Sequence, residues 1–531
     1  MSLVNYLVHT NTPQTSPLFG RTDQVKNSAG GFVFGVSPET RLTRFLILGT
    51  TGGTYYASEK DLTIENANEV KSSFATLGVR AVDLIKEISC AKPTRAPKNG
   101  PCVLALAIGA VFGDESVKNA AWAALPDVCR IPTDLFAFID AYQKLGGGWG
   151  RRAKRGVANW YQSKSDSLAY TTTKYMSRDG WSHRDLLRLA HITPWSPESQ
   201  QIFAYLVKGE LTTETTEVTE YLRIVGESLR GELSEADLLK SIKEHRLPRE
   251  VLNTKYLNSP LVWESLLETM PVGAMIRNLG KMTSIGLLKP LSSGERMVLG
   301  HLTQEKIVNA RMHPLSILSA QKIYNLGHGI KGNLTWQPNT SIVGALDRAF
   351  MSAFGGIVPT GKRTLIALDV SSSMTYGEIA GLNLTPREAS AAMAMSSVRT
   401  EPQCHVVGFA HNLIQLPFIT SSASLREVVS GIDRIPFGST DCSAPFTYAT
   451  ANKLEVDMFQ VYTDNETYAG RMHPSVALQQ YREKSGINAK LVVNGMTATN
   501  FTIADPKDPG MMDVVGADTS LPNIIREFSQ W

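Results

Sequence analysis

Apolar side chains recur at three- and four-residue spacing through most of the first 330 residues of the chain. Ala81, Leu84, Ile85 and Ile88 are one example. This spacing places the apolar side chains on one face of a helix, so the pattern over residues 41–326 predicts successive amphipathic helices. Glycine and proline divide the pattern into segments of helix length. Many short helices in sequence are typical of an α-solenoid of HEAT type, although no clean repeat period accompanies them.

The pattern changes near Gly361, where short apolar runs replace the helical spacing. Such runs are typical of buried parallel strands. The predicted strands cover residues 363–370, 405–409, 413–418, 458–463, 490–493 and 512–515. Helices are predicted between most of these strands, and one helix covers residues 386–398. The alternation of strands and helices predicts a doubly wound α/β domain. We therefore predict a multidomain chain with an all-α domain over residues 1–360 and an α/β domain over residues 361–531. A connection with one helix, at about residues 341–354, ends the first domain.

Net charge is distributed unevenly along the 531 residues. The whole chain carries +4, but residues 361–531 hold 13 basic and 17 acidic side chains, a net charge of −4. Residues 144–191 alone hold 10 basic and 3 acidic side chains, a net charge of +7. Such a cluster is expected at a site that binds a polyanion, and a solvated helix surface is the other interpretation.

The cysteines and the hydropathy of the chain indicate the cellular compartment in which the protein is expected. The five cysteines are odd in number and form no CxxC pair, so neither a disulfide framework nor a zinc site is predicted. The first residues, MSLVNYLVHTNTPQ, lack the features of a signal peptide, and no apolar run is long enough to span a bilayer. We expect a cytoplasmic monomer without membrane association.

Polar residues suited to a hard cation follow two of the predicted strands. Asp369, Ser371 and Ser373 form a D-x-S-x-S string directly after the first strand. Thr440 lies in a later loop, and Asp464 follows the strand 458–463. Ligands of open α/β sheets bind beyond the carboxyl ends of the strands, and hydroxyl and carboxylate oxygens suit Mg²⁺ or Mn²⁺. The alternative is a polar loop cluster that forms hydrogen bonds without a metal.

Together these residues resemble the metal-ion-dependent adhesion site of the von Willebrand factor A fold. The resemblance implies one divalent cation bound by Ser371, Ser373 and Thr440, with Asp369 and Asp464 contacting it directly or through water. It also implies an open coordination position, which a partner's carboxylate or a phosphate could fill. The natural ligand of that position is not indicated.

The basic cluster consists of two stretches. The first contains Arg151, Arg152, Lys154 and Arg155, which suit phosphates, and it is followed by Trp160-Tyr161. Aromatic side chains can stack on unpaired bases, but those of this stretch are better explained as core residues.

The second stretch begins with Lys174 and Arg178, which are four residues apart and are predicted to share one helix face. Gly180 is expected to end that helix, and Ser182 to cap the next one. On the second helix, a polar face is predicted to contain three residues at spacings of four and three: Arg184, Arg188 and His191. These charges could also be ordinary solvated side chains.

Several long motifs resemble the Ro 60-kDa autoantigen family, which carries the TROVE domain. They are RLTRFLILGTTGGTYY (41–56), GWGRRAKRGVANWY (148–161), TKYMSRDGWSHRDLLRLAH (173–191), MIRNLGKMT (275–283) and the DVSSS, GSTDCS and YTDNETYAG strings of the metal motif. The resemblance covers essentially the whole chain. It implies a ring of HEAT-like repeats whose ends are joined by the von Willebrand factor A domain.

The same resemblance implies a function in RNA quality control. Members bind small Y RNAs on an outer basic surface and single-stranded 3′ ends of misfolded RNAs in a central cavity. The family's Y-RNA contacts match Lys174, Arg178 and His191 in type and spacing, whereas Met176-Ser177 replaces a more basic pair of vertebrate members. In bacterial members the Y RNA is thought to tether an exoribonuclease, polynucleotide phosphorylase. The resemblance implies the same partner for this chain.

Three classes of function are therefore open. The first is an RNA-binding ring that is not an enzyme, and the second is a metal-dependent protein-adhesion scaffold with incidental RNA binding. The third is a metal-dependent nuclease, which the ligand set disfavours because one cation bound mostly by hydroxyls activates water weakly. The net charge of +7 within 48 residues favours the first class over the second.

Overall fold

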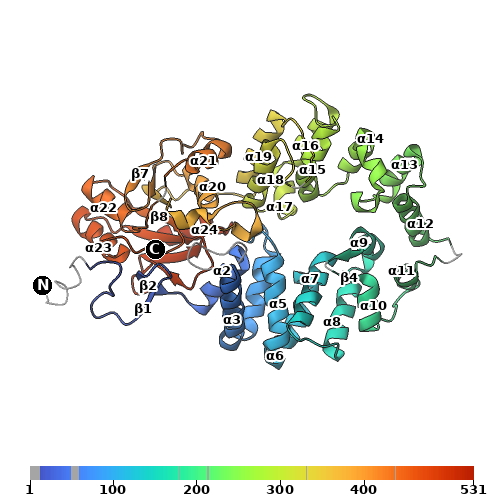
Figure 1. Ribbon diagram of the computed structural model, residues 1–531, viewed down its shortest axis with the longest axis horizontal. Coiled ribbons are helices and arrows are strands. Elements are labelled where there is room, and N and C mark those ends of the chain that lie inside the picture. Colours follow the sequence, from blue (N-terminus) through green and yellow to red (C-terminus); the bar gives the residue numbers. More distant parts are fainter. Residues whose placement is uncertain are drawn as a thin grey trace.

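The computed structural model describes residues 12–49, 59–178, 180–211, 215–330, 332–436 and 438–530, and the side chains of residues 59–66 are left out of the description. A curved array of helices forms most of the molecule, and an α/β domain contacts both of its ends (Figure 1). The predicted fold class, a helical ring followed by an α/β domain of the von Willebrand factor A type, is confirmed. No helix in the described part of the chain is long and apolar enough to cross a membrane.

The first half of the array is built from two rows of helices. The helices are α2 (Pro38–Leu48), α3 (Glu59–Leu77), α4 (Val79–Cys90), α5 (Gly100–Phe112), α6 (Glu115–Val128), α7 (Pro132–Lys144), α8 (Arg151–Gln162), α9 (Leu168–Lys174) and α10 (His183–Ala190). Helices α4, α6, α8 and α10 pack side by side in one row, and α3, α5 and α7 form the other. Each buries the apolar face that its sequence predicts, as Leu84, Ile85 and Ile88 do on α4.

The second half continues the curve and returns to the α/β domain (Figure 1). Its helices are α11 (Pro197–Lys208), α12 (Glu217–Arg230), α13 (Glu235–His245), α14 (Pro260–Leu267), α15 (Val272–Ser284), α16 (Ser293–His301), α17 (Gln304–Asn309), α18 (Pro314–Leu326) and α19 (Thr340–Ser352). Helix α19 is the helix expected in the connection.

The α/β domain contains a six-stranded sheet in the order β11-β9-β8-β5-β6-β7. Its strands are β5 (Thr364–Asp369), β6 (Cys404–Phe409), β7 (Leu413–Gln415), β8 (Met458–Thr463), β9 (Lys490–Gly495) and β11 (Met511–Val515). All neighbours are parallel except β6 and β7, which a short turn joins as an antiparallel pair.

Helices cover both faces of this sheet. They are α20 (Pro386–Val398), α21 (Leu425–Ile432), α22 (Ala444–Ala451), α23 (Pro474–Ser485) and α24 (Leu521–Gln530). Alternate residues of β5 enter different cores: Ile366 and Leu368 join the cluster that contains α20, α21 and α24, whereas Leu365 and Ala367 join the cluster that contains α22 and α23. Burial on both faces explains why β5 is apolar without alternation.

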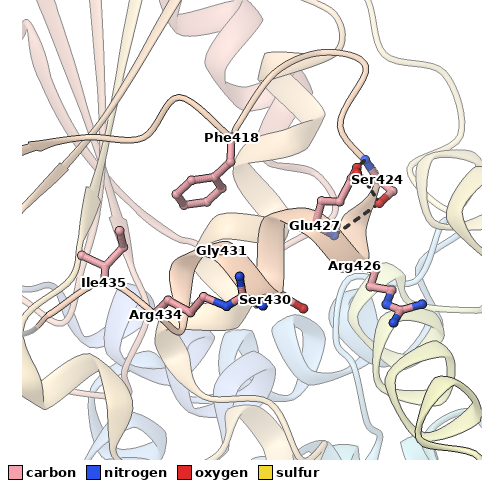
Figure 2. Close-up of a pocket in the computed structure, with 8 residues that line it drawn as sticks. All are labelled: Phe418, Ser424, Arg426, Glu427, Ser430, Gly431, Arg434 and Ile435. Atoms are coloured by element: carbon pink, nitrogen blue, oxygen red, sulfur yellow. Dashed lines mark hydrogen bonds between the residues drawn. The ribbon is translucent and has the colours of Figure 1, made fainter.

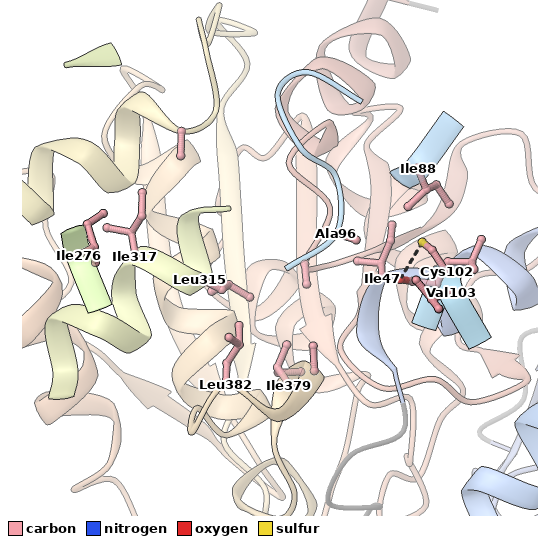
Figure 3. Close-up of a cluster of buried hydrophobic side chains, with 14 of the residues drawn as sticks. Ile47, Ile88, Ala96, Cys102, Val103, Ile276, Leu315, Ile317, Ile379 and Leu382 are labelled. Atoms are coloured by element: carbon pink, nitrogen blue, oxygen red, sulfur yellow. Dashed lines mark hydrogen bonds between the residues drawn. The ribbon is translucent and has the colours of Figure 1, made fainter. Parts of the chain in front are cut away.

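The two ends of the helical array meet at the α/β domain, which closes the ring. Arg95, after α4, forms an ion pair with Asp518 at 2.7 Å, and Lys322 of α18 forms one with Glu388 of α20 at 2.5 Å. Side chains from both ends and from the α/β domain share one buried cluster (Figure 3), among them Ile47, Val103, Leu315, Ile317, Ile379 and Leu382.

A segment before α2 was not expected to form strands. It contains β1 (Gln24–Lys26) and β2 (Phe32–Gly35), which pair with each other, and β2 also pairs with β10 (Phe501–Thr502) of the α/β domain. The segment that contains β1 and β2 therefore packs against the α/β domain.

Candidate metal centre and basic face

The five predicted metal ligands meet at the carboxyl edge of the sheet. Asp369 ends β5, and Asp464 directly follows the neighbouring parallel strand β8, so their carboxylates project from the same edge. The turn after β5 supplies Ser371 and Ser373, and the loop before α22 supplies Thr440. The structure brings together all five residues that the sequence analysis named for the cation.

Hydrogen bonds order the ligands after β5. The Ser371 amide donates to Asp369 Oδ1 at 2.9 Å, and the Ser371 and Ser373 hydroxyls are 3.1 Å apart. Thr463 Oγ1 donates to Asp369 Oδ2 at 2.7 Å. Sequence reasoning did not select Thr463, which holds the carboxylate from the adjacent strand. Each of the five ligands is at most 2% exposed.

The polar atoms that remain unsatisfied fit a divalent cation. Among the described residues, Thr440 Oγ1 and Asp464 Oδ2 are buried without a hydrogen-bond partner. Burial, and then the charge of Asp464, raises the pKa of Asp369 to about 7, and burial also raises the pKa of Asp464. Two buried carboxylates and an orphaned hydroxyl are an unfavourable arrangement that a cation would relieve.

The candidate centre depends on hydroxyl ligands. Within the described ranges, no group of three His, Cys, Asp or Glu side chains is arranged to hold a metal ion. A third carboxylate, Glu466, lies near Asp464, and burial followed by the charge of Asp464 raises its pKa to about 8. The sequence string contained Glu466, but nothing in its spacing distinguished it from a surface residue.

The first basic stretch lies at the start of α8, in the row formed by α4, α6, α8 and α10. Arg151 and Arg155 are exposed and Lys154 is half-buried. Within the described part of the chain, no hydrogen bond or ion pair engages these three side chains. Arg152 differs, because its guanidinium pairs with Glu115 and donates to Asn119 Oδ1 at 2.9 Å.

The second stretch departs from its predicted geometry. Helix α9 ends at Lys174, and Arg178 lies in β3 (Ser177–Arg178), which forms a hairpin with β4 (Trp181–Ser182). The prediction that Lys174 and Arg178 share a helix face is therefore wrong. Gly180 does not end a helix but forms the hairpin turn with a φ of +83°, a conformation that glycine adopts without strain.

Helix α10 follows the prediction closely. Ser182 and Asp185 form its capping box, Arg184, Arg188 and His191 are exposed, and His191 caps the end in a left-handed conformation. An eight-residue helix is roughly 12 Å long. Arg178 therefore lies near the start of α10 and His191 lies at its end. Lys174 ends α9, where its Nζ lies 3.3 Å from the Tyr170 hydroxyl and its side chain lines a cavity with Arg249 and Glu250. The three residues therefore do not form a single contact point.

We use the term basic face for eight basic side chains of the α8–α10 region, of which Lys154 and Lys174 are half-buried and the others exposed: Arg151, Lys154, Arg155, Lys174, Arg178, Arg184, Arg188 and His191. Farther along the same row, two basic side chains of α4 are paired. Arg80 of α4 pairs with Glu87 at 2.5 Å, and Lys86 of α4 pairs with Asp127 of α6 at 2.9 Å. These pairs partly neutralise the positive charge of α4.

Aromatic residues near the basic face belong to the core, as predicted. Trp160 and Tyr161 are fully buried. Trp160 Nε1 donates to the Cys129 carbonyl at 2.5 Å, and the Tyr161 hydroxyl lies 2.6 Å from His183 Nδ1. Neither ring is available to stack on a base.

A separate groove lies along α21 of the α/β domain (Figure 2). Its lining includes Phe418, Arg426, Glu427 and Arg434, and Glu427 is bonded to Ser424 as the cap of α21. No residue that lines it belongs to the metal ligands or to the basic face.

Comparison with known proteins agrees with this two-part organisation. A family model described as the TROVE domain matches residues 25–225 and 244–362, and one described as the Ro60 vWA domain matches residues 363–529. The chain is 40% identical over 527 residues to the RNA-binding protein RO60 of Deinococcus radiodurans, covering 98% of this chain and 97% of that relative. It is 38% identical over 582 residues to the RNA-binding protein RO60 of Caenorhabditis elegans, covering 95% and 90%.

Among solved structures, the chain is similar to the crystal structure of the Deinococcus radiodurans RO (RSR) protein. The TM-score is 0.67 at 37% sequence identity, covering 93% of this chain and 99% of that one. The order of the helical ring and the α/β domain, together with these matches over nearly the full length, shows that the chain belongs to the Ro60 family.

Proposed function

We propose that this protein binds structured non-coding RNA on the basic face and is not an enzyme. The observation that carries the proposal is the set of exposed arginines on α8 and α10, Arg151, Arg155, Arg184 and Arg188, which no acidic side chain in the described part of the chain neutralises. Arginine and lysine on an open convex surface suit phosphates, which supply most of the affinity for RNA. The curated relatives are named RNA-binding proteins, which supports the same function.

The RNA that suits this surface is a Y RNA or a similar stem. A strip roughly 12 Å long along α10 is compatible with several consecutive phosphates of a duplex. Single-stranded 3′ ends of misfolded RNAs would use the opening of the ring in addition, in a role in RNA quality control. An exoribonuclease tethered through the Y RNA would then degrade the captured RNA.

We also propose that the α/β domain holds one Mg²⁺ or Mn²⁺. Asp369, Ser371, Ser373, Thr440 and Asp464 would bind it, since they converge at one edge and include two orphaned oxygens. The cation would supply an open coordination position for a carboxylate or a phosphate of a partner. Its role is binding, because hydroxyl ligands leave the cation a weak activator of water.

Crosslinking the protein to RNA in its own cell, followed by sequencing, tests the proposed function. We expect enrichment of structured small RNAs, with crosslinked peptides from α8 to α10. A variant with Arg151, Arg155, Arg184 and Arg188 replaced by alanine should lose that enrichment. Recovery of the same RNAs with this variant would contradict binding on the basic face.

A further inference from the structure

The N-terminal arm, residues 12–36, lies against the loops that carry the candidate metal ligands. Its β2 strand pairs with β10, and its turns reach the loop after β8. We infer that the arm, through Gln14 and Asn27, is a positioning element for the metal centre, although it precedes the α/β domain by more than 300 residues of helical ring. This inference rests on the proposed cation.

Gln14 is the central contact of the arm. Its side chain is completely buried, and its amide is fully used. Nε2 donates to Asp441 Oδ1 and to the Met472 carbonyl, both at 2.8 Å. Oε1 accepts from Thr467 Oγ1 and from the Gly470 amide. One neutral side chain thus connects the residue beside Thr440 with the loop that follows Asp464.

Asn27 makes a second connection at the other side of the same loop. Its Nδ2 donates to the Asn465 carbonyl at 3.1 Å and to the Thr467 carbonyl at 2.9 Å. Asn465 directly follows the ligand Asp464 and has a φ of +66°, which is costly for a residue with a side chain. Gly31 approaches so closely that a Cβ there would lie 1.8 Å from the Thr467 carbonyl oxygen.

Thr467 also connects the two ligand loops directly. Its hydroxyl oxygen accepts from the Cys442 amide at 3.0 Å while it donates to the arm. The Tyr468 and Ala469 amides both donate to the Thr440 carbonyl, at 3.1 and 2.9 Å. The separation of Thr440 from the loop of Asp464 is therefore set by a network that the arm completes.

The arm holds these loops without occupying the cation's ligands. Near the proposed centre it bonds to the side chains of Asp441, Glu466 and Thr467 and to backbone groups. Thr440 Oγ1 and Asp464 Oδ2 remain without partners in the described part of the chain. Outer residues that orient ligands in this way commonly change metal affinity by about 10–100-fold when they are replaced. An α/β domain without the arm lacks this network, so the metal centre requires two segments from opposite ends of the chain.

The test compares two variants of the full chain. Gln14→Met keeps the length of the side chain and removes its four hydrogen bonds. Arg21→Met removes another contact of the arm, the ion pair with Asp505 at 2.5 Å, and Asp505 belongs to none of the loops that carry a proposed ligand. Mn²⁺ affinity is measured by titration calorimetry, and amide hydrogen exchange of Tyr468 and Ala469 is measured without metal.

We expect Gln14→Met to weaken Mn²⁺ binding by at least about 10-fold and to speed exchange of both amides. Arg21→Met should match the wild type within about 2-fold. If Gln14→Met does not fold, Asn27→Ala replaces it in the same comparison.

Equal Mn²⁺ affinity and equal exchange in the wild type and in the Gln14 or Asn27 variant would overturn the inference. A loss of the same size in Arg21→Met would also overturn it, because general docking of the arm would then be the cause. If the wild type binds no Mn²⁺ and only Gln14→Met loses amide protection, the proposed cation fails while the positioning of the loops by the arm stands.

Discussion

The basic face and the metal centre use polar side chains in opposite ways. The basic face presents exposed cations on helices that are close in sequence, and most of these cations touch little else. The proposed ligands of the metal centre are at most 2% exposed and come from loops far apart in the chain. Exposed charges give an affinity for RNA that is nearly additive over the residues and sensitive to salt. The affinity of a buried site for a cation depends on every residue that holds its ligands in place.

The two regions should therefore respond differently to substitution. The basic face should lose affinity in small steps, because each side chain contributes one phosphate contact. The metal centre should fail as a unit, because each ligand is fixed by hydrogen bonds from another segment.

The largest expected effect separates the two regions. Asp369→Ala should abolish Mn²⁺ binding, because it removes a carboxylate that orders Ser371 and Thr463. RNA affinity should stay within about 2-fold of the wild type, since phosphate contacts on the ring do not involve the cation. Calorimetry and fluorescence anisotropy on the full chain measure the two affinities. Glu455→Ala, which removes an exposed carboxylate, is the control; a parallel loss of RNA binding in Asp369→Ala would show that the two regions are coupled.

Salt should distinguish the basic face from a buried site. If about 4–6 phosphates are neutralised, the plot of log K against log[salt] should have a slope of about −3 to −5, so RNA affinity falls by about 10²–10³-fold between 50 and 200 mM salt. Anisotropy titrations over a salt series give the slope. A flat dependence would contradict the electrostatic interpretation of the face.

Substituting Lys174 and Arg178 tests the part of the basic face that precedes α10. Lys174→Ala with Arg178→Ala should weaken binding of a Y-RNA-like stem by about 2–5 kcal/mol, since two charged contacts are lost. RNA with a single-stranded 3′ tail, which should also use the ring opening, should lose less. The control is Arg80→Ala with Lys86→Ala, an equal change of charge on α4, outside the basic face. An equal loss for both RNA types would indicate one shared site.

Acid should weaken the contact between the helical ring and the α/β domain. Burial lowers the pKa of His313, which precedes α18, to about 4. Three neighbours oppose this shift without cancelling it: the Ala517 carbonyl, 2.9 Å from Nε2, the charge of Asp518 and the backbone of Arg95. The unfolded chain binds the proton near pH 6.5 and the folded chain only near pH 4, so stability falls as pH drops through this window. The loss for this group between pH 7 and 5 is about 2 kcal/mol. Urea unfolding at both pH values should show it, and His313→Gln should reduce the difference.

The smallest effect compares two neighbouring arginines of α8. Arg155→Ala should weaken RNA binding by about 5-fold, since its guanidinium is unpaired within the described residues. Arg152→Ala should have less effect, because Glu115 already neutralises that charge. Anisotropy at one fixed salt concentration measures both, and equal losses would mean that the pair with Glu115 opens when RNA binds.

Local sequence signals predicted the helices, the sheet strands and the order of the two domains. The capping box of Ser182 and Asp185 and the helix 386–398 were found from spacing alone, because their hydrogen bonds and apolar contacts are local. The signal failed between Lys174 and Arg178, where four-residue spacing suggested a helix but the chain forms a hairpin. A two-stranded hairpin of two residues per strand has almost no periodicity to detect.

The sequence by itself was enough to propose the metal ligands and the basic residues, because serine, threonine and aspartate at a strand end and arginines at the start of a helix express their chemistry locally. Only the tertiary structure decided which cations remain unpaired and which segments enclose the metal centre. Glu115 of α6 pairs with Arg152 of the neighbouring helix α8, and Gln14 bonds to Asp441 and Thr467 from the other end of the chain. Contacts between residues far apart in sequence follow from how the elements pack, and no spacing along the chain records them.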